Sequence, residues 1–152
     1  MPDGCVEENR FAERTGRGID RIFEGALNYG RPLPDYSRSN RRGVSVLLPR
    51  SVPDKAFVEL LAEERERSGK SMSLDGLLIL DKLKSERRCG FDVLSGSLDM
   101  SDQRLRTVLG QLTEAGLVES AGVGARRTYM LGAKVYRRSG RAMEYVRPIR
   151  HR

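Results

Sequence analysis

The sequence predicts an α+β fold in which several helices lead into a two-stranded hairpin. Three observations predict it. Leucine-rich stretches with helical spacing fill residues 54–116. A serine stands directly before two of these stretches, where its hydroxyl can cap a helix. Two short β-prone runs, 117–119 and 128–131, enclose a stretch of small residues that ends in two arginines.

The first expected elements are a helix and a strand within residues 1–50. Apolar residues recur at helical spacing in 11–29, and a loop rich in proline, glycine and serine follows over 30–42. The run 44–48, "VSVLL", should form a short strand that ends at Pro49. A helix and a strand cannot bury each other's apolar faces alone, so we expect a remnant of a larger α/β domain that leans on the next domain or on a second copy.

Four helical segments are expected next. The first covers 54–68 with Phe57, Leu60 and Leu61 turned inward, and the second covers 74–86, capped by Ser73, at the centre of the core. A short helix of about two turns should lie within 89–100. Ser101 should cap the fourth, which ends before Gly116. The expected core residues of the second and fourth helices are Leu74, Leu77, Leu78, Leu80 and Leu83, and Leu105, Val108, Leu109 and Leu112.

The order of these helices and the hairpin is that of a winged helix-turn-helix domain, which we expect over 51–138, followed by a basic tail over 139–152. The buried residues of the fourth helix leave its opposite face outward. That face carries side chains able to hydrogen-bond base edges or phosphates: Gln103, Arg106, Thr107 and Gln111, with Arg104 at the flank. Arg126 and Arg127, at the end of the hairpin, would reach a neighbouring phosphate or a narrow groove.

The charge distribution favours duplex DNA as the partner. The chain of 152 residues has a formal charge of +7 and a pI near 9.8. Residues 120–152 carry nine Lys and Arg residues against one acidic residue, Glu144, whereas 51–119 carry ten basic and thirteen acidic residues. A basic excess confined to one end of the chain predicts a localised basic surface.

Several other classes are disfavoured. No apolar run is long enough to cross a bilayer and the first ten residues lack the pattern of a signal peptide, so we expect a cytoplasmic protein without membrane contact. Cys5 and Cys89 fit free thiols in a reducing compartment. Because His151 is the one histidine, neither a zinc site nor a His-based catalytic group is expected. No other metal, no cofactor and no enzymatic activity are expected of these residues.

Two alternatives stay open. A winged helix can also serve protein–protein contact or homodimer formation, with the strand over 44–48 pairing across the dimer. Nucleotide hydrolysis is the other, and tight ATP binding by this chain would support it.

The segment "ERTGRGIDRI", residues 13–22, followed by "GVSVLLPR", resembles the end of the divergent GHKL-like ATPase domain of bacterial transcriptional regulators related to the C-terminus of RecG-type DNA helicases. The family pattern is E-R-x-G-T-G-I-x-R-I, in which Arg17 replaces the usual threonine. In that family a winged helix comes next, so the resemblance implies a DNA-binding transcriptional regulator. The front half of the ATPase-like domain, which supplies metal- and adenine-binding residues, is absent, so the resemblance implies a fragment without a nucleotide site. The matching residues are Glu13, Arg14, Gly16, Gly18, Ile19, Arg21 and Ile22.

Overall fold

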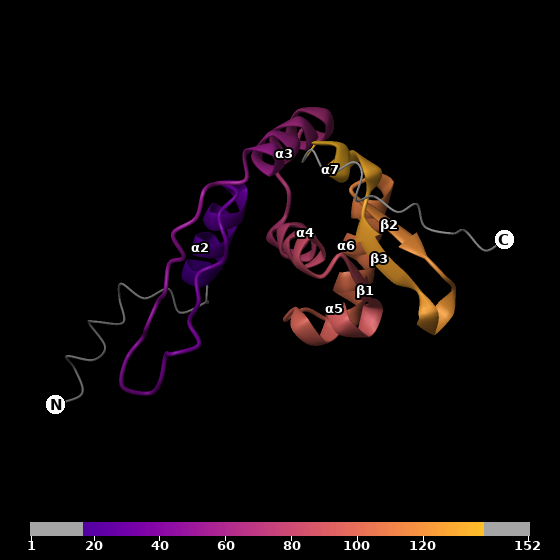
Figure 1. Cartoon of the computed structure of the whole chain (residues 1–152). Helices are drawn as coiled ribbons and strands as arrows, with labels where there is room; N and C mark the ends of the chain where they lie inside the picture. The colour runs from indigo at the N-terminus through magenta and orange to yellow at the C-terminus, as the bar shows by residue number, and fades with distance from the viewer. Residues whose placement is uncertain (1–16, 139–152) are drawn as a thin grey trace. The chain divides into compact units, whose positions relative to one another are not determined.

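The computed structural model describes residues 17–138, which fall into two units (Figure 1). The N-terminal unit is Met1–Pro53 and the C-terminal unit is Asp54–Arg152. Several features expected from the sequence lie outside the described residues: the basic tail over 139–152, the beginning of the first helix over 11–16, the motif residues Glu13, Arg14 and Gly16, and the side chains of Cys5 and His151.

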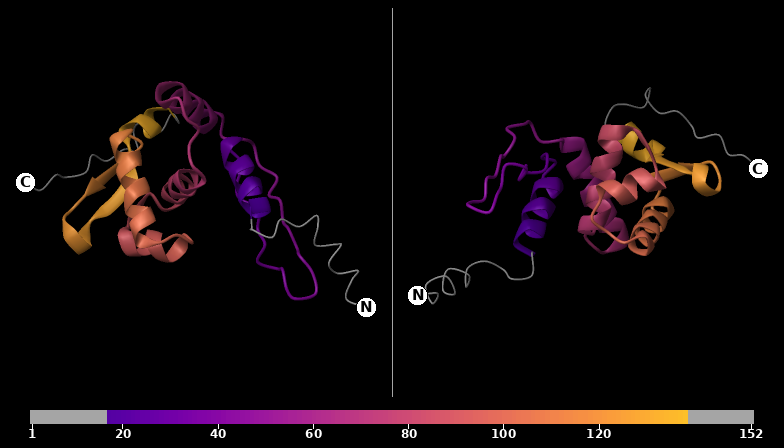
Figure 2. Two further views of the ribbon diagram at one scale, coloured as in Figure 1. Left: turned by 180° about the vertical axis from the view of Figure 1, so that it is seen from behind. Right: turned by 90° about the horizontal axis from the view of Figure 1, so that it is seen from below.

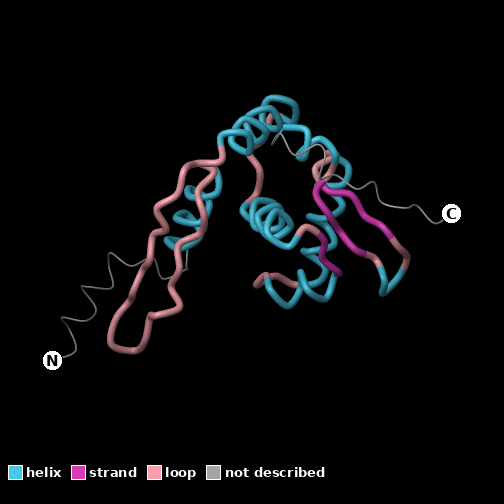
Figure 3. Tube along the Cα trace, viewed as in Figure 1, coloured by secondary structure: helices cyan, strands magenta, loops and turns pink. Residues whose placement is uncertain are grey.

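The N-terminal unit contains one helix, α2 (Arg17–Asn28), within its described residues. This confirms the expected amphipathic helix, in which Leu27 is buried and the Phe23 ring lies 6.0 Å from that of Tyr36. The prediction of a strand over 44–48 is wrong. One isolated bridge joins Asp35 to Leu47, and the rest of this segment is loop (Figure 3). On one side of this bridge the opposing residue is Pro34, which has no N–H to donate. On the other side the hydroxyl of Ser39 occupies both the N–H and the carbonyl of Ser45.

The C-terminal unit begins with four helices: α3 (Lys55–Ser68), α4 (Leu74–Glu86), α5 (Phe91–Ser97) and α6 (Asp102–Glu114). All four confirm expected helices. Side-chain caps explain where three of them begin, because each satisfies a backbone N–H that the first turn leaves without a partner. Asp54 accepts from the N–H of Phe57 at 3.1 Å, Ser73 from Gly76 at 3.2 Å and Ser101 from Arg104 at 3.3 Å.

The core of this unit forms where α4 and α6 pack against each other and against the sheet. The four expected core residues of α6 are all buried. On α4 the buried face is rotated relative to the expected one. Leu74 and Leu78 are half-buried, whereas Ile79, not expected in the core, is fully buried beside Leu80 and Leu83. The rotation brings Gly76 inward, where a glycine lets Met72 pack closely.

A three-stranded antiparallel sheet of order β1-β3-β2 completes the unit. The strands are β1 (Arg88–Gly90), β2 (Val118–Ala121) and β3 (Thr128–Leu131), so the expected hairpin is confirmed, with β2 beginning one residue later than predicted. The third strand was not expected, because Cys89 and Gly90 were placed at the start of the short helix. In the structure Cys89 pairs with Tyr129 and Gly90 with Thr128. A three-residue strand that pairs with residues so distant in sequence leaves no local pattern.

The last described helix, α7 (Ala133–Arg138), packs against α3. Val135 and Tyr136 are its buried residues. The views in Figure 1 and Figure 2 show α7 beside α3, with the free end of the β2–β3 hairpin directed away from both. The described chain is therefore α+β, as expected. None of its helices, within residues 17–138, combines the length and apolar character needed to span a membrane.

Candidate nucleic-acid interface

Helix α6 separates its side chains cleanly into two faces. Leu105, Val108, Leu109 and Leu112 are buried, with Leu105 fully inaccessible to solvent. The residues predicted to face DNA are all exposed: Gln103, Arg104, Arg106, Thr107 and Gln111. Gly110 is exposed on the same side. We call Gln103, Arg106, Thr107, Gly110 and Gln111 together the polar face of α6.

Four of the predicted residues line one open depression beside the start of α4. Gln103, Arg104, Thr107 and Gln111 form its α6 side. Ser73, Asp75 and Ser101 contribute from the two helix N-termini, and the depression has a volume of about 490 Å³. The structure thus brings together side chains of α6 with the capping serines of α4 and α6.

Arg104 is engaged within the protein. Its Nε donates to a carboxylate oxygen of Asp75, in the first turn of α4, and the two form an ion pair. Asp75 is only 13% exposed and Arg104 is 63% exposed. The pair connects α6 to α4 across the depression. Asp75 therefore occupies the Nε–H of Arg104, and the other N–H groups of this exposed guanidinium can still donate to a phosphate.

Arg106 lies on the other flank of α6 and stacks on α5. Its guanidinium carbon is 4.8 Å from the centre of the Phe91 ring. Such stacking occupies one flat side of the guanidinium and leaves the in-plane N–H groups able to donate. The ring thus restricts the orientations of Arg106 without using its hydrogen bonds.

The beginning of α6 is further held by side-chain hydrogen bonds. Ser95 of α5 donates to Asp102 at 2.6 Å. Thr107 donates to the backbone carbonyl of Gln103 at 3.0 Å, so its hydroxyl oxygen remains able to accept. The Ser95–Asp102 hydrogen bond and the Arg104–Asp75 pair thus connect the first turn of α6 to α5 and to α4.

Residues 122–127, the hairpin tip, connect β2 to β3. Gly122 has φ of 83° and a Cβ there would lie 2.6 Å from the carbonyl oxygen of Arg126, so the tight turn requires glycine. A short 3-10 turn, Gly124–Arg126, follows. Arg126 and Arg127 are exposed, and among residues 17–138 neither guanidinium has an ion pair or hydrogen bond.

Helix α6 and this hairpin belong to the same side of the C-terminal unit. α6 contacts β2, and the short connection through Gly116 reverses the chain between them. The free end of the hairpin therefore lies toward the beginning of α6, as the left view of Figure 2 shows. The hairpin tip thus lies toward the end of the unit at which α6 begins.

The basic excess at the C-terminal end is not all available for a partner. Lys134 forms an ion pair with Glu64, and Arg138 forms one with Glu63. Both pairs connect α7 to α3. The described cations without such an acidic partner in this stretch are Arg126, Arg127 and Arg137, and Arg137 lies 3.5 Å from the carbonyl oxygen of Ala133.

Glu64 is a buried acid that the sequence reasoning missed. Its side chain is 6% exposed, and one carboxylate oxygen accepts from Nε and Nη2 of Arg67 at 3.0 and 2.7 Å while the other accepts from Lys134. Burial alone would raise the pKa of Glu64, but the hydrogen bonds and charges of Arg67 and Lys134 together outweigh it and lower the pKa. Glu64 therefore stays ionised and holds α7 on α3.

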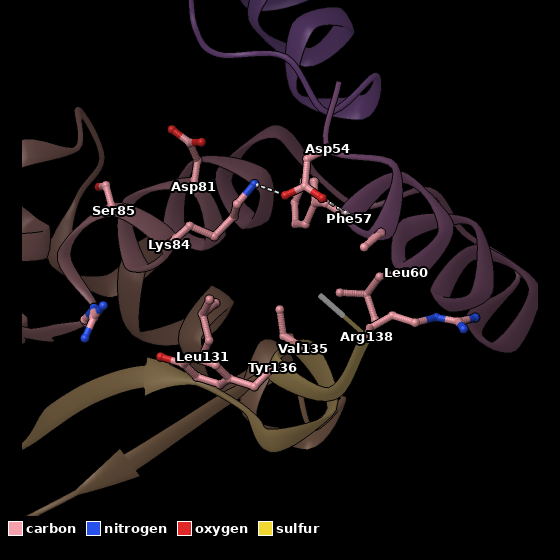
Figure 4. Close-up of a pocket in the computed structure, with 12 residues that line it drawn as sticks. Asp54, Phe57, Leu60, Asp81, Lys84, Ser85, Leu131, Val135, Tyr136 and Arg138 are labelled. Atoms are coloured by element: carbon pink, nitrogen blue, oxygen red, sulfur yellow. Dashed lines mark hydrogen bonds and ion pairs between the residues drawn. The ribbon is translucent and has the colours of Figure 1, made fainter. Parts of the chain in front are cut away.

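A second hollow, of about 480 Å³, lies between α3 and α4 on one side and β3 and α7 on the other (Figure 4). Its inner lining is mainly apolar. Lys84 pairs with Asp54 at 2.8 Å and lies 4.4 Å from the centre of the Phe57 ring. Asp81 also borders the hollow, and burial raises the pKa of its carboxyl. In Figure 4 the Asp81 carboxylate points away from the apolar side chains. The apolar lining residues are Ala56, Phe57, Leu60, Leu131, Val135 and Tyr136.

This second hollow does not fit the predicted function. It is more enclosed than the depression beside α6, yet its Lys84 and Arg138 are already paired with acids. Its lining contains no histidine or cysteine. Across residues 17–138, no group of three His, Cys, Asp or Glu side chains is arranged to hold a metal ion.

Asp75 and Gly110 are the residues of the α6 region that the sequence reasoning missed. The contact of Asp75 with α6 could not be predicted from the sequence, because an acid in the first turn of a helix is explained by the helix dipole alone. Gly110 could have been noticed in the sequence, because a glycine in the interior of a capped helix costs about 1 kcal/mol of stability relative to alanine.

Comparison with known proteins adds nothing to this geometry: no family model, no curated protein and no solved structure matches the chain.

Proposed function

We propose that the C-terminal unit is a winged helix-turn-helix module that binds duplex DNA. We propose further that the protein is a cytoplasmic transcriptional regulator, related to the RecG-type family that the sequence resembles. In this proposal α5 and α6 form the helix-turn-helix, α6 enters the major groove and the β2–β3 hairpin is the wing. The supporting element order is α4, β1, α5, α6, β2, β3.

The observation that carries the proposal is the separation of the two faces of α6. Its apolar residues are all used in the core, and its opposite face is exposed, polar and without a large apolar side chain. Protein interfaces usually centre on apolar or aromatic side chains, whereas DNA grooves are read by amides, hydroxyls and guanidinium groups. The polar face of α6 therefore suits DNA better than protein.

The residues have distinct roles in this proposal. Arg126 and Arg127 bind phosphates, because they are exposed and have no acidic partner among the described residues. Arg106 is pre-oriented by Phe91 toward the groove. Gln103, Thr107 and Gln111 face base edges or the groove wall. Arg104 donates to a phosphate through the N–H groups that Asp75 does not use.

The test is fluorescence anisotropy of a labelled mixed-sequence duplex over a salt series, with the wild type and Arg126→Ala/Arg127→Ala. Each phosphate contact contributes about 0.9 to the slope of log affinity against log salt, so the double variant should lose roughly one to two units of slope. The matched control is Arg65→Ala/Lys70→Ala. It removes the same charge from exposed positions at α3, away from the hairpin tip.

The control variant should retain the wild-type slope. Equal losses in both double variants would show that net charge, and not the hairpin tip, carries the binding. No binding by the wild type even at low salt would reject the proposed function.

A second candidate function, protein–protein contact, is favoured by a different observation. The exposed large apolar side chains of the described residues lie mostly in the N-terminal unit: Ile19, Ile22, Tyr29, Val44, Val46, Leu47, Leu48 and Val52. Where such side chains form one contiguous patch, they are typical of an interaction surface. Light scattering over a protein concentration series tests for a homodimer, and a monomer at every concentration would contradict self-association.

A further inference from the structure

Gly110 lies at the centre of the polar face of α6. In a helix, residues three and four positions apart are neighbours, so Arg106 and Thr107 adjoin Gly110 on one side and Thr113 and Glu114 on the other. All four side chains are exposed, as is Gly110 itself. The centre of this face is therefore bare backbone, surrounded by longer polar side chains.

The described fold gives no internal reason for this glycine. Gly110 does not have a positive φ, and a Cβ built on it meets no atom within 4 Å. Two other glycines of the unit do have a reason: a Cβ at Gly122 would meet the Arg126 carbonyl oxygen and one at Gly132 would meet that of Gly116. Gly96 of α5 resembles Gly110, since a Cβ there also meets nothing within 4 Å. Alanine at position 110 would fit the helix and favour it.

What distinguishes Gly110 is its place on the exposed polar face of α6, where the absent side chain leaves room for a close approach from outside. We propose that Gly110 is the point at which the backbone of α6 comes closest to bound duplex DNA, which rests on the proposed function. The groove wall packs against the bare backbone there, while Arg106, Thr107 and Gln111 reach past it on either side. Glu114, one turn further on, repels phosphates and marks the end of the contact.

DNA suits this position better than a protein helix. Close packing of two proteins at a glycine is stabilised by apolar side chains around it. Here the neighbours are an arginine, a threonine, a glutamine and a glutamate, and no exposed large apolar residue of the described chain lies on α6.

The experiment measures duplex affinity and thermal unfolding for the wild type, Gly110→Ala and Gly110→Leu. The alanine variant should melt roughly 4–8 °C higher, because it relieves the conformational cost of glycine in a helix. Its DNA affinity should nevertheless fall by about fivefold or more, because a methyl group is forced into a packed contact. Leucine should weaken binding further.

A loss of DNA affinity caused by steric overlap can be distinguished from one caused by the removal of a charge. The salt slope of both Gly110 variants should equal that of the wild type, because no phosphate contact has been removed. The matched control is Gly25→Ala in α2, another interior helix glycine whose Cβ would meet nothing within 4 Å. It should leave DNA affinity unchanged.

The outcomes separate this inference from the proposed function. If the wild type binds DNA and Gly110→Ala binds equally well, Gly110 is not a point of close approach and the inference is wrong, while the proposed function stands. If the wild type does not bind DNA, the proposed function fails and the inference fails with it. A variant that loses self-association and keeps its DNA affinity would assign the glycine to a second copy of the chain and overturn the inference.

Discussion

Replacing Glu64 with glutamine should lower the free energy of unfolding of the C-terminal unit by about 2 kcal/mol at neutral pH. The carboxylate is 6% exposed and accepts from two side chains, Arg67 and Lys134. A hydrogen bond to a charged group contributes about 1.5–3 kcal/mol. We use the lower part of that range as the total for all hydrogen bonds to Glu64. The reason is that Arg67 and Lys134 are 56% and 37% exposed, so water solvates them when the carboxylate is removed.

The matched control is Glu63→Gln, in the adjacent position of α3. Glu63 also pairs with a cation of α7, Arg138, but the two side chains are 45% and 41% exposed. An exposed pair of this kind contributes about 0–1 kcal/mol. Chemical denaturation followed by circular dichroism should therefore separate the two variants, with Glu64→Gln the less stable by more than 1 kcal/mol.

The pH dependence gives a second check. The pKa of Glu64 is lowered in the folded state, so its stabilisation is complete above the unfolded-state pKa of about 4.3 and is lost as the pH falls through the lower folded-state pKa. The difference between wild type and Glu64→Gln should shrink over that acid range. If Glu64→Gln and Glu63→Gln lowered the free energy of unfolding equally at pH 7, burial would not strengthen the Glu64 interactions and the reasoning would be wrong. The same holds if the difference in stability between wild type and Glu64→Gln persisted at the lowest pH.

Two further predictions concern packing and charge elsewhere in the unit. Gly132→Ala should lower the free energy of unfolding, measured by urea denaturation, by about 3 kcal/mol, because its Cβ would lie 2.2 Å from the backbone oxygen of Gly116. Its control is Gly96→Ala, whose Cβ would have no atom within 4 Å, and which should not lower the free energy of unfolding. Asp81→Asn should increase stability at pH 7, because burial raises the pKa of this carboxyl and the ionised form is disfavoured in the folded state. That gain should disappear as the pH falls toward the unfolded-state pKa of about 3.9, and a loss of stability at pH 7 would contradict it.

The elements predicted correctly from sequence were those with local signals. Ser73 and Ser101 mark helix starts because a capping hydroxyl acts within three residues, and the structure shows both hydrogen bonds. The leucines of α6 follow one helical period and all four are buried. The positive φ of Gly116, 73°, agrees with its expected place after the helix.

The features that were missed depend on partners distant in sequence. β1 exists because β3 lies beside it, with Arg88 opposite Met130. The strand expected at 44–48 has suitable residues but no neighbour able to form a ladder. In the candidate site, exposure of the polar residues followed from the helical pattern. The pairing of Arg104 with Asp75 and the stacking of Arg106 on Phe91 did not, because each requires the packing of α6 on another helix.

The contact between α3 and α7 has a consequence for how this unit can be joined to other segments. α3 is the first helix of the unit and α7 the last that the structure describes, and two ion pairs connect them. The described part of the unit therefore begins and ends with neighbouring helices, while the hairpin tip is directed away from both (Figure 1). A unit with adjacent ends can be inserted into another protein, or circularly permuted, with little strain.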